Sequence, residues 1–534
     1  MANEGANHNI IKLKSISSIT TARHTASDSE FEMGWREKAE RAKSLHRPSL
    51  KNWARDGLAS TFPAYESYIL SNEEAYCSFK IKNGVVLDTR LNVDDARQEG
   101  VPVILDGDTP PEVFHKEYEA KCIPVVIRNI PYGVNNRSNG EVSSCSSKEG
   151  NFQEEKKDCD EMHYNLQSNV DPSRTHNNEW PAIHNWSLSS LYNNPLLRSR
   201  TFKVGEDDDG YSIKMKLRHF LRYLESNQDD SPLYVFDASF DEDRYAKRLL
   251  LDYTVPNYFD EDLFRLVGER RRPPYRWFLV GPQRSGTTVH IDPLGTSAWN
   301  TLIHGVKRWV LFPPHVSKSV VKGYREILKG EDDEAIHYFT TILPRVKRRA
   351  ASVAEAALAG ARRLGEYENF ECYEFTQYAG ETVFIPHGWW HAVLNVTHTV
   401  GVTQNYCSRR NFDAVWTRTR SGRKKMACTW LRRLNDHYPD LAARARELNR
   451  RDGFVMWEDD HEEQRRWMRK RAEKARRKRE KEASRQGREG DGDGSENKRQ
   501  SKKEKWGEHR TNGQRKDEDD CNSVTSGANI VSPT

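Results

Sequence analysis

The sequence predicts a mainly β fold with flanking helices, in which the strands form a barrel or a sandwich. Between residues 232 and 407 the chain contains short runs rich in β-branched and aromatic residues, among them LYVF, RWFLV, RWVLF, TVFI and HAVLNV. Glycine, proline and histidine turns separate these runs, and several short strands at close spacing are typical of all-β barrels and sandwiches. Helix-like patterns occur mainly before and after this region, so helices are expected to flank the strands.

The segments that precede the strands are predicted to contain a charged helix and a buried strand. Residues 1–33 are polar and expected to be disordered, and residues 34–57 have the pattern of a charged helix or helix pair. Thr109 is expected to cap a helix whose first turn holds two prolines and a capping-box acid. The β-branched run IPVVIRNI at 123–130 suits a buried strand.

The remaining segments differ from the strand region in composition. Residues 132–178 are rich in Asn, Ser, Glu and Lys and are expected to be a disordered insertion. Within 217–224, three leucines and a phenylalanine recur at i, i+3, i+4 and i+7, which predicts an amphipathic helix. Residues 345–367 are Ala-rich and helix-prone, and residues 411–455 are expected to be C-terminal helices. Residues 456–534 are predicted to be a basic, charged tail that is helical at first and then largely disordered.

The composition favours a soluble chain that works inside the cell. Hydrophobic residues make up 36% of the 534 positions and charged residues 31%, which agrees with a partly disordered chain. The net charge of +5 hides a basic run, because residues 465–488 hold 13 Lys or Arg against three Glu. The eight cysteines form no C-x-x-C pair, which argues against a structural zinc site and favours a reducing compartment. No signal-peptide pattern is found at the start and no apolar run of about 18 residues is present, so no membrane span is expected.

The strongest chemical signal is a His-x-Asp triplet with a distant histidine. His290 and Asp292 lie two positions apart, and His391 follows 101 positions after the first histidine. In a strand, residues i and i+2 point to the same face, so the imidazole and the carboxylate lie side by side. Two histidines and one carboxylate leave three open positions on an octahedral metal, which suits non-haem Fe(II). The alternative is a chance triplet, since such triplets are common.

Two features near the triplet favour the metal interpretation. His391 lies in FIPHGWWHAVLNV, where two tryptophans can shield a metal from bulk water. Lys307 lies in the next strand after His290, between strongly apolar runs. A buried lysine is costly unless an anion pairs with it, and a dicarboxylate co-substrate would supply that anion. The alternative for Lys307 is a solvated position on the outer face of the barrel.

Several long stretches resemble JmjC-domain oxygenases that depend on Fe(II) and 2-oxoglutarate. The resemblance covers residues from about 34 to about 435 and is interrupted by the insertions at 132–178 and 345–367, which have no counterpart in the family. The stretches that carry it are GEDDDGYSIKMK, DDSPLYVFDASF, DYTVPNYFDEDLF, RRPPYRWFLVGPQRSGTTVHIDPLGTSAWNTLIHGVKRWVLFPP and GETVFIPHGWWHAVLNVTHTVGVTQN. Neither insertion removes a candidate ligand, although both can alter access of a substrate.

The resemblance implies a double-stranded β-helix, the jelly-roll barrel of cupin-like proteins, formed by residues 179–410 with an N-terminal part at 34–131. It implies that His290, Asp292 and His391 are the iron ligands and that Lys307 pairs with the distal carboxylate of 2-oxoglutarate. The residues at positions where family members contact this co-substrate are Thr287, Asn300, Thr403 and Tyr234. Asn405 lies beside them. The alternatives are ordinary strand and turn hydrogen bonds for the first three and core packing for the tyrosine.

The resemblance further implies an enzyme that uses Fe(II), 2-oxoglutarate and O₂ to hydroxylate lysine side chains, to demethylate methylarginine, or to do both. Histones and RNA-splicing factors are the protein substrates that it suggests, with a nuclear location. The helices at 411–435 resemble helices that form dimers in related oxygenases, so a homodimer is also expected.

A different class of function is an RNA- or protein-binding nuclear scaffold. The basic runs at 469–481 and 498–505 are typical of nuclear-localisation signals or sequence-independent nucleic-acid contacts. Trp467 and Trp506 can stack on bases, but the same tail also fits a solvated charged helix. A third option is a cupin-like metal protein that is not an oxygenase. The intact triplet together with Lys307 favours the enzyme.

Overall fold

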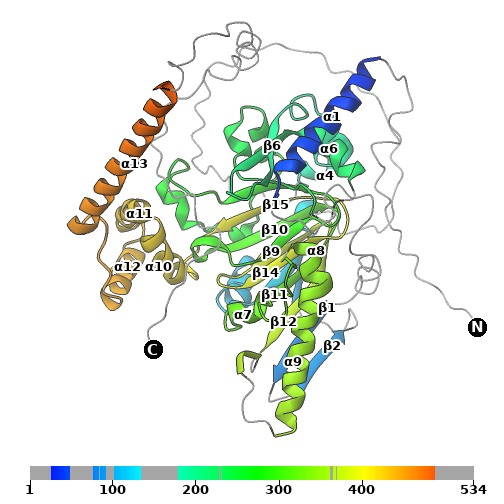
Figure 1. Cartoon of the computed structure of the whole chain (residues 1–534). Helices are drawn as coiled ribbons and strands as arrows, with labels where there is room; N and C mark the ends of the chain where they lie inside the picture. The colour runs from blue at the N-terminus through cyan, green and yellow to red at the C-terminus, as the bar shows by residue number, and fades with distance from the viewer. Residues whose placement is uncertain are drawn as a thin grey trace, which may run out of the picture.

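Two large β-sheets form the centre of the molecule in the computed structural model (Figure 1). The structure describes residues 26–48, 76–82, 85–91, 101–133 and 179–487, apart from 228, 230, 333, 361–364 and 368–369. One sheet has the order β2-β1-β12-β11-β14-β9 and the other β3-β4-β13-β10-β15-β8-β7, and the neighbouring strands are antiparallel except β3 and β4. This arrangement confirms the predicted jelly-roll barrel.

The strands of the first sheet are β1 Tyr76–Lys82, β2 Val85–Leu91, β9 Gly286–His290, β11 Val306–Phe312, β12 Glu371–Tyr378 and β14 Trp390–Asn395. Those of the second are β3 Val103–Leu105, β4 Val125–Arg128, β7 Val235–Asp237, β8 Arg276–Gly281, β10 Ser297–His304, β13 Glu381–Ile385 and β15 Thr399–Tyr406. A separate hairpin joins β5 Thr201–Glu206 to β6 Ser212–Lys216.

The interior of the barrel follows from the two-residue period of its strands. On β11, Trp309 and Leu311 belong to the cluster between the sheets, whereas Val310 and Phe312 belong to a second cluster on the outer face. Val383 of the opposite sheet joins the inner cluster. Because side chains alternate along a strand, every second residue of β11 and β14 points into the barrel. Positions in step with Trp309 are therefore the ones that can form an internal site.

Helices cover both outer faces. The first sheet is covered by α7 Lys318–Val321, α8 Ala335–His337 and α9 Leu343–Leu358, which bury one apolar cluster against it. Helices α1 Ala26–Leu45, α3 Pro111–Phe114, α4 Ala182–Asn185, α5 Leu188–Asn193 and α6 Leu217–Ser226 contribute to the cluster on the second sheet. Helices α10 Phe412–Gly422, α11 Lys424–His437 and α12 Pro439–Arg451 form a third cluster with residues 263–267. In Figure 1 they lie beside α13 His461–Gly487.

Several sequence predictions are met by these elements. The apolar stripe at 217–224 is fully buried in α6, and 125–128 of the predicted strand form the buried β4. The Ala-rich segment forms α9, and the predicted C-terminal helices are α10–α12. No helix within the described ranges is long and apolar enough to cross a membrane.

Two local predictions need correction. Helix α1 begins at Ala26, before the expected start at 34, and ends at Leu45. Thr109 is not the cap of α3: the capping position is Pro110, without a side-chain hydrogen bond. With Thr109 as the cap, the first two helical residues would be prolines without an N–H, which leaves only the N–H of Glu112 for the threonine hydroxyl.

The basic tail was expected to be helical after about residue 455 and then disordered, and the structure confirms the helical part. Residues 461–487 form the 27-residue helix α13. Its Lys, Arg and Glu residues are strong helix formers, and the pair Arg476–Glu480 is spaced at i and i+4. Trp467 also lies against Trp457 and under the ammonium of Lys425, which attaches the start of the helix to α11. Residues 1–25, 134–178 and 488–534, on which the other disorder predictions fall, lie outside the described residues.

Candidate active site

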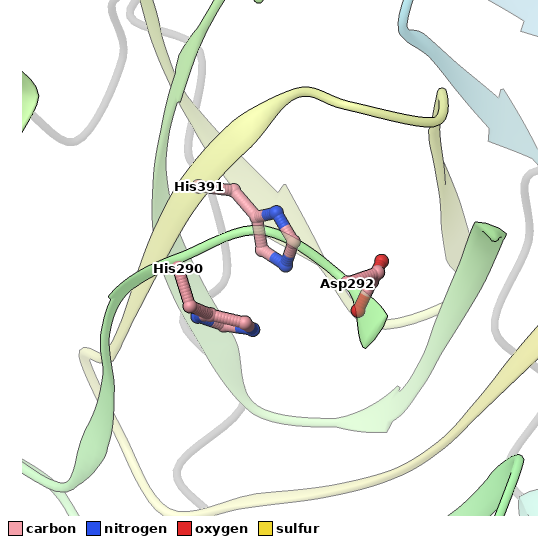
Figure 2. A group of neighbouring side chains, drawn as sticks. All are labelled: His290, Asp292 and His391. Atoms are coloured by element: carbon pink, nitrogen blue, oxygen red, sulfur yellow. The ribbon is translucent and has the colours of Figure 1, made fainter. Parts of the chain in front are cut away.

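The three predicted metal ligands lie together. His290 is the last residue of β9, and Asp292 follows it after one residue. His391 is the second residue of β14 and is paired directly with His290 across the two antiparallel strands, so both imidazoles point to the same face. One ligand atom from each of the three residues lies within 4.8 Å of the other two. Figure 2 shows the three side chains pointing toward one another.

The backbone fixes which nitrogen of each histidine can bind a metal. Nδ1 of His290 lies 2.7 Å from the carbonyl oxygen of Thr288, and Nδ1 of His391 lies 3.2 Å from that of Trp389. A carbonyl only accepts, so each Nδ1 carries the proton and each Nε2 keeps a free lone pair. Burial, followed by the nearby His391, lowers the pKa of His290 to about 3, which keeps this ring neutral at physiological pH. Neutral imidazole is the form that binds a metal.

The carboxyl group of Asp292 is only partly satisfied by hydrogen bonds. Its Oδ2 is buried and has no hydrogen-bond partner among the described residues. Burial raises the pKa of this carboxyl, opposed by His391 and by a hydrogen bond with Asn405. A buried carboxylate oxygen with no partner is costly, and a divalent cation between it and the two Nε2 atoms would remove that cost. The donor set of two imidazoles and one carboxylate fits Fe(II).

A short loop connects Asp292 to the C-terminal helices. Pro293–Gly295 form a single tight turn in which Leu294 has a φ of 57°, a left-handed conformation that is unfavourable for leucine. Leu294 packs against the cluster of α10–α12, and its Cδ2 lies 3.6 Å from where a Cβ on Gly422 would be. Arg418 of α10 lies directly over Gly295. The carboxylate ligand is therefore held by the helices, whereas the histidines are held by the sheet.

Lys307 points into the barrel, as its spacing from Trp309 requires. Its side chain is 1% exposed, and Nζ donates to Oδ1 of Asn300 at 3.1 Å. No carboxylate in the described part of the chain forms an ion pair with it, and burial lowers its pKa to about 7. The outer-face alternative for Lys307 is thus wrong. A buried ammonium with a neutral amide as its partner fits an anionic ligand.

The other predicted contact residues surround this lysine in different ways. Thr287 Oγ1 is buried without a hydrogen-bond partner among the described residues, which fits a ligand contact. Thr403 is paired with Asn300 across β15 and β10, but its hydroxyl donates to the carbonyl of Trp299 at 2.8 Å. That bond is the ordinary strand hydrogen bond offered as the alternative, and the contact of Thr403 with a co-substrate stays a prediction.

Tyr234 and Asn405 also lie near the predicted pocket. Tyr234 precedes β7; burial raises its pKa, opposed by a hydrogen bond with Asn395. Asn395 is paired with Lys307 across β14 and β11. The hydrogen bond to Asn395 therefore places Tyr234 near the strand position of Lys307. Asn405 donates to Oγ1 of Thr296 at 3.0 Å and thereby supports the loop that carries Asp292.

Three residues of the site were missed by the sequence reasoning. Gln377 is paired with Lys307 on the other side of β11, is fully buried, and donates to the carbonyl of Asn300 at 2.9 Å. Asn395 donates to Ser285 Oγ at 2.8 Å. Trp309 lies with its ring centroid 6.2 Å from that of His391 and forms an apolar wall. The signal for Asn395 was present, because it lies at i+4 from His391 and so shares its face of the strand.

Comparison with known proteins gives one family match and several relatives. The model of the cupin-like domain family matches residues 110–413. The bifunctional arginine demethylase and lysyl-hydroxylase psr-1 of Caenorhabditis elegans is 45% identical over 262 residues, 49% of this chain and 61% of the relative. The lysine-specific demethylase JMJ21 of Arabidopsis thaliana is 38% identical over 237 residues, 44% of this chain and 23% of the relative.

A third relative, the 2-oxoglutarate and iron-dependent oxygenase JMJD4 homolog of Drosophila melanogaster, is 31% identical over 173 residues, 32% of this chain and 34% of the relative. The chain thus spans about three fifths of the length of psr-1 and less of the other two. The matched region includes the whole predicted metal and co-substrate site.

Proposed function

This chain belongs to the cupin-like domain family, and from that premise we propose that it is an Fe(II)- and 2-oxoglutarate-dependent dioxygenase of protein side chains. The observation that carries the proposal is that one barrel holds both a metal-ligand set and a buried lysine. His290, Asp292 and His391 offer donor atoms for a divalent cation, and Lys307 offers an ammonium for an anion. Iron(II) and a dicarboxylate fit these two groups.

The roles of the residues follow from their positions. His290, Asp292 and His391 hold the metal on one face and leave its other face open. Lys307 binds the distal carboxylate of 2-oxoglutarate, with Asn300 orienting its ammonium and Tyr234, Thr287 and Thr403 contacting the same co-substrate. Iron with 2-oxoglutarate and O₂ supplies the oxidation of a substrate C–H bond, with succinate and CO₂ as co-products. The protein contributes orientation and a dry apolar wall at Trp309.

The substrate side chain is lysine, methylarginine, or both. The names of psr-1 and of JMJ21 support this choice, since they describe lysyl hydroxylation and demethylation in those proteins. Hydroxylation of a lysine carbon leaves a stable product. Hydroxylation of an N-methyl group gives a hemiaminal that releases formaldehyde.

We further propose a nuclear location, with histones or splicing factors as substrates. The exposed basic face of α13 supports a nuclear-import signal. Contact with RNA through the tail and dimerisation through 411–435 remain predictions.

The experiment measures succinate formation by the iron-loaded full chain with 2-oxoglutarate, O₂ and a panel of Lys- and methylarginine-containing peptides, which are then weighed by mass spectrometry. A gain of about 16 Da on lysine identifies hydroxylation, and a loss of about 14 Da with formaldehyde identifies demethylation. His290→Ala must abolish both. His184→Ala, at an exposed histidine of α4, is the matched control and must leave both unchanged.

Each result separates the proposals. Succinate without peptide modification supports the oxygenase and argues against the substrate class. If neither wild type nor variant forms succinate although iron is shown to be bound, the oxygenase proposal is overturned and the scaffold function is favoured.

A further inference from the structure

A pocket of about 430 Å³ lies between helix α9 and the loop at 322–331. It is lined by Arg325, Glu326, Arg345, Arg348, Arg349 and Ser352, and we call it the arginine pocket. It lies on the outer face of the first sheet, away from the metal ligands, because α9 buries its apolar side against that face. Most of its lining residues belong to the Ala-rich segment at 345–367.

The polar stripe of α9 is not required by the fold. The buried face of the helix consists of Val346, Ala350 and Ala354, which are 0% exposed in the cluster on the sheet. The residues of the opposite stripe, at i, i+3, i+4 and i+7, are Arg345, Arg348, Arg349 and Ser352. Any polar residue satisfies a solvent-facing stripe, so three arginines on it call for another explanation.

The charges of the pocket are only partly balanced. Arg345 is neutralised by Glu331, with N–O distances of 2.6 and 3.0 Å. Arg325 lies 3.3 Å from Glu366. Arg348 and Arg349 are exposed, and no carboxylate of the described residues forms an ion pair with either of them. These two guanidinium groups therefore remain available for an anion.

The loop that carries Arg325 also holds two exposed large side chains. Tyr324 is 56% exposed and Leu328 is 59% exposed, and both lie in the loop that carries Arg325. Tyrosine and arginine are enriched among the residues that dominate binding energy. An arginine fork also binds carboxylate or phosphate through two parallel hydrogen bonds.

We propose that the arginine pocket is a docking site for an acidic segment of a partner protein. Carboxylates or phosphoserines of that segment pair with Arg348 and Arg349, and the hydroxyl of Ser352 donates to the same anion. Tyr324 and Leu328 contact its apolar side chains. The exposed Tyr324 and Leu328 in the same loop favour a protein segment over a nucleic acid, because apolar side chains of such a segment can pack against them. This inference is independent of the proposed catalysis.

The test uses the full chain and a fluorescein-labelled peptide of nine residues with glutamates on both sides of a phenylalanine. A second peptide carries phosphoserine at the glutamate positions, and a nine-nucleotide single-stranded RNA serves as the competing ligand. The perturbing variant is Arg348→Glu with Arg349→Glu. The matched control is Arg433→Glu with Arg450→Glu, two exposed arginines of α11 and α12 that change the net charge equally. Thermal unfolding must show both variants folded.

The pocket variant is expected to bind the better of the two peptides about tenfold more weakly, since two charge-assisted contacts become repulsive, and the control less than about twofold. Bound peptide is expected to slow amide hydrogen exchange in 343–358. The relative affinities of the two peptides identify carboxylate or phosphate as the anion. Equal weakening by both variants, protection confined to the basic helix α13, or protection of 343–358 by RNA instead of peptide would overturn the proposal.

Discussion

Replacement of Lys307 by methionine is expected to stabilise the ligand-free protein while removing its affinity for 2-oxoglutarate. The lysine is 1% exposed and its hydrogen-bond partner among the described residues is the amide of Asn300, so the folded protein holds an ammonium at the cost of its hydration. Methionine has a similar length and no charge, and it fills the same space between Asn395 and Gln377.

The magnitude follows from the pKa of the lysine. Burial lowers it from 10.5 to about 7, which at about 1.36 kcal/mol per unit corresponds to a cost on the order of 5 kcal/mol for the charged form. Loss of the lysine leaves Oδ1 of Asn300 without its donor, at a cost of about 1–3 kcal/mol. The expected net gain at pH 7 or below is about 2–4 kcal/mol in the free energy of unfolding. Binding of 2-oxoglutarate is expected to weaken about 10- to 150-fold, since a charge-assisted hydrogen bond contributes about 1.5–3 kcal/mol.

The lowered pKa of Lys307 also determines the direction in which the stability of the protein changes with pH. Because the folded-state value lies below the unfolded one, the unfolded chain binds more protons between pH 7 and 10.5, and the wild type gains stability as pH rises through this window. The gain of the methionine variant over wild type should therefore shrink in the same window. A bound dicarboxylate raises the pKa of Lys307, so binding takes up a proton above pH 7, and affinity should fall by up to about tenfold per pH unit.

The assay is thermal unfolding at pH 7 and pH 9, with and without 2-oxoglutarate, under anaerobic conditions with Mn²⁺ in place of iron. Lys214→Met, at an exposed lysine of β6, is the control and should change neither the stability nor the response to 2-oxoglutarate. A methionine variant that is less stable than wild type without ligand, yet equally stabilised by 2-oxoglutarate, would refute the reasoning.

Three further substitutions test other parts of the site. Asp292→Asn is expected to lower the affinity for Fe(II) at least about tenfold without loss of folding, as measured by metal titration and circular dichroism, because it removes the only charged ligand. Gly286→Ala would drive its Cβ into the backbone carbonyl of Val393 and separate β9 from β14, at a cost of about 1–3 kcal/mol in chemical denaturation, whereas Gly34→Ala in α1 meets no atom and should not destabilise. Thr287→Val removes a buried unpartnered hydroxyl, so it should leave stability unchanged or slightly raised while increasing the KM for 2-oxoglutarate.

The part of the site that the sequence predicted is the part that lies close together along the chain. His290 and Asp292 are two residues apart and do lie together, although only His290 belongs to β9 and Asp292 lies in the turn that follows the strand. Lys307 was predicted from its chemistry, as a cation in an apolar run, and the structure confirms that it is buried. The barrel was predicted from short strands with frequent turns. This pattern is local in the sequence and does not depend on how the strands pack.

The part that the sequence did not predict depends on pairing between distant strands. Gln377 is 70 positions from Lys307, and only the register of β12 against β11 makes them neighbours. Thr403 satisfies its hydroxyl on the strand beside it, which neither its identity nor its spacing could show. The left-handed Leu294 is invisible locally as well, because leucine disfavours this conformation and only packing against α10–α12 maintains it.

Because Leu294 packs against α10–α12, the metal ligands are held by two different parts of the structure, the β-sheet and the helical layer. Two ligands move with the sheet and the third moves with the helical layer, so a small sliding of one layer over the other changes the distance between carboxylate and imidazoles without breaking either layer. Retention of the metal then depends on the packing between the sheet and the helical layer as much as on the ligands themselves. A molecule bound to the outer side of α10–α12 would therefore act on the coordination geometry through Leu294 and through Arg418, which lies over Gly295.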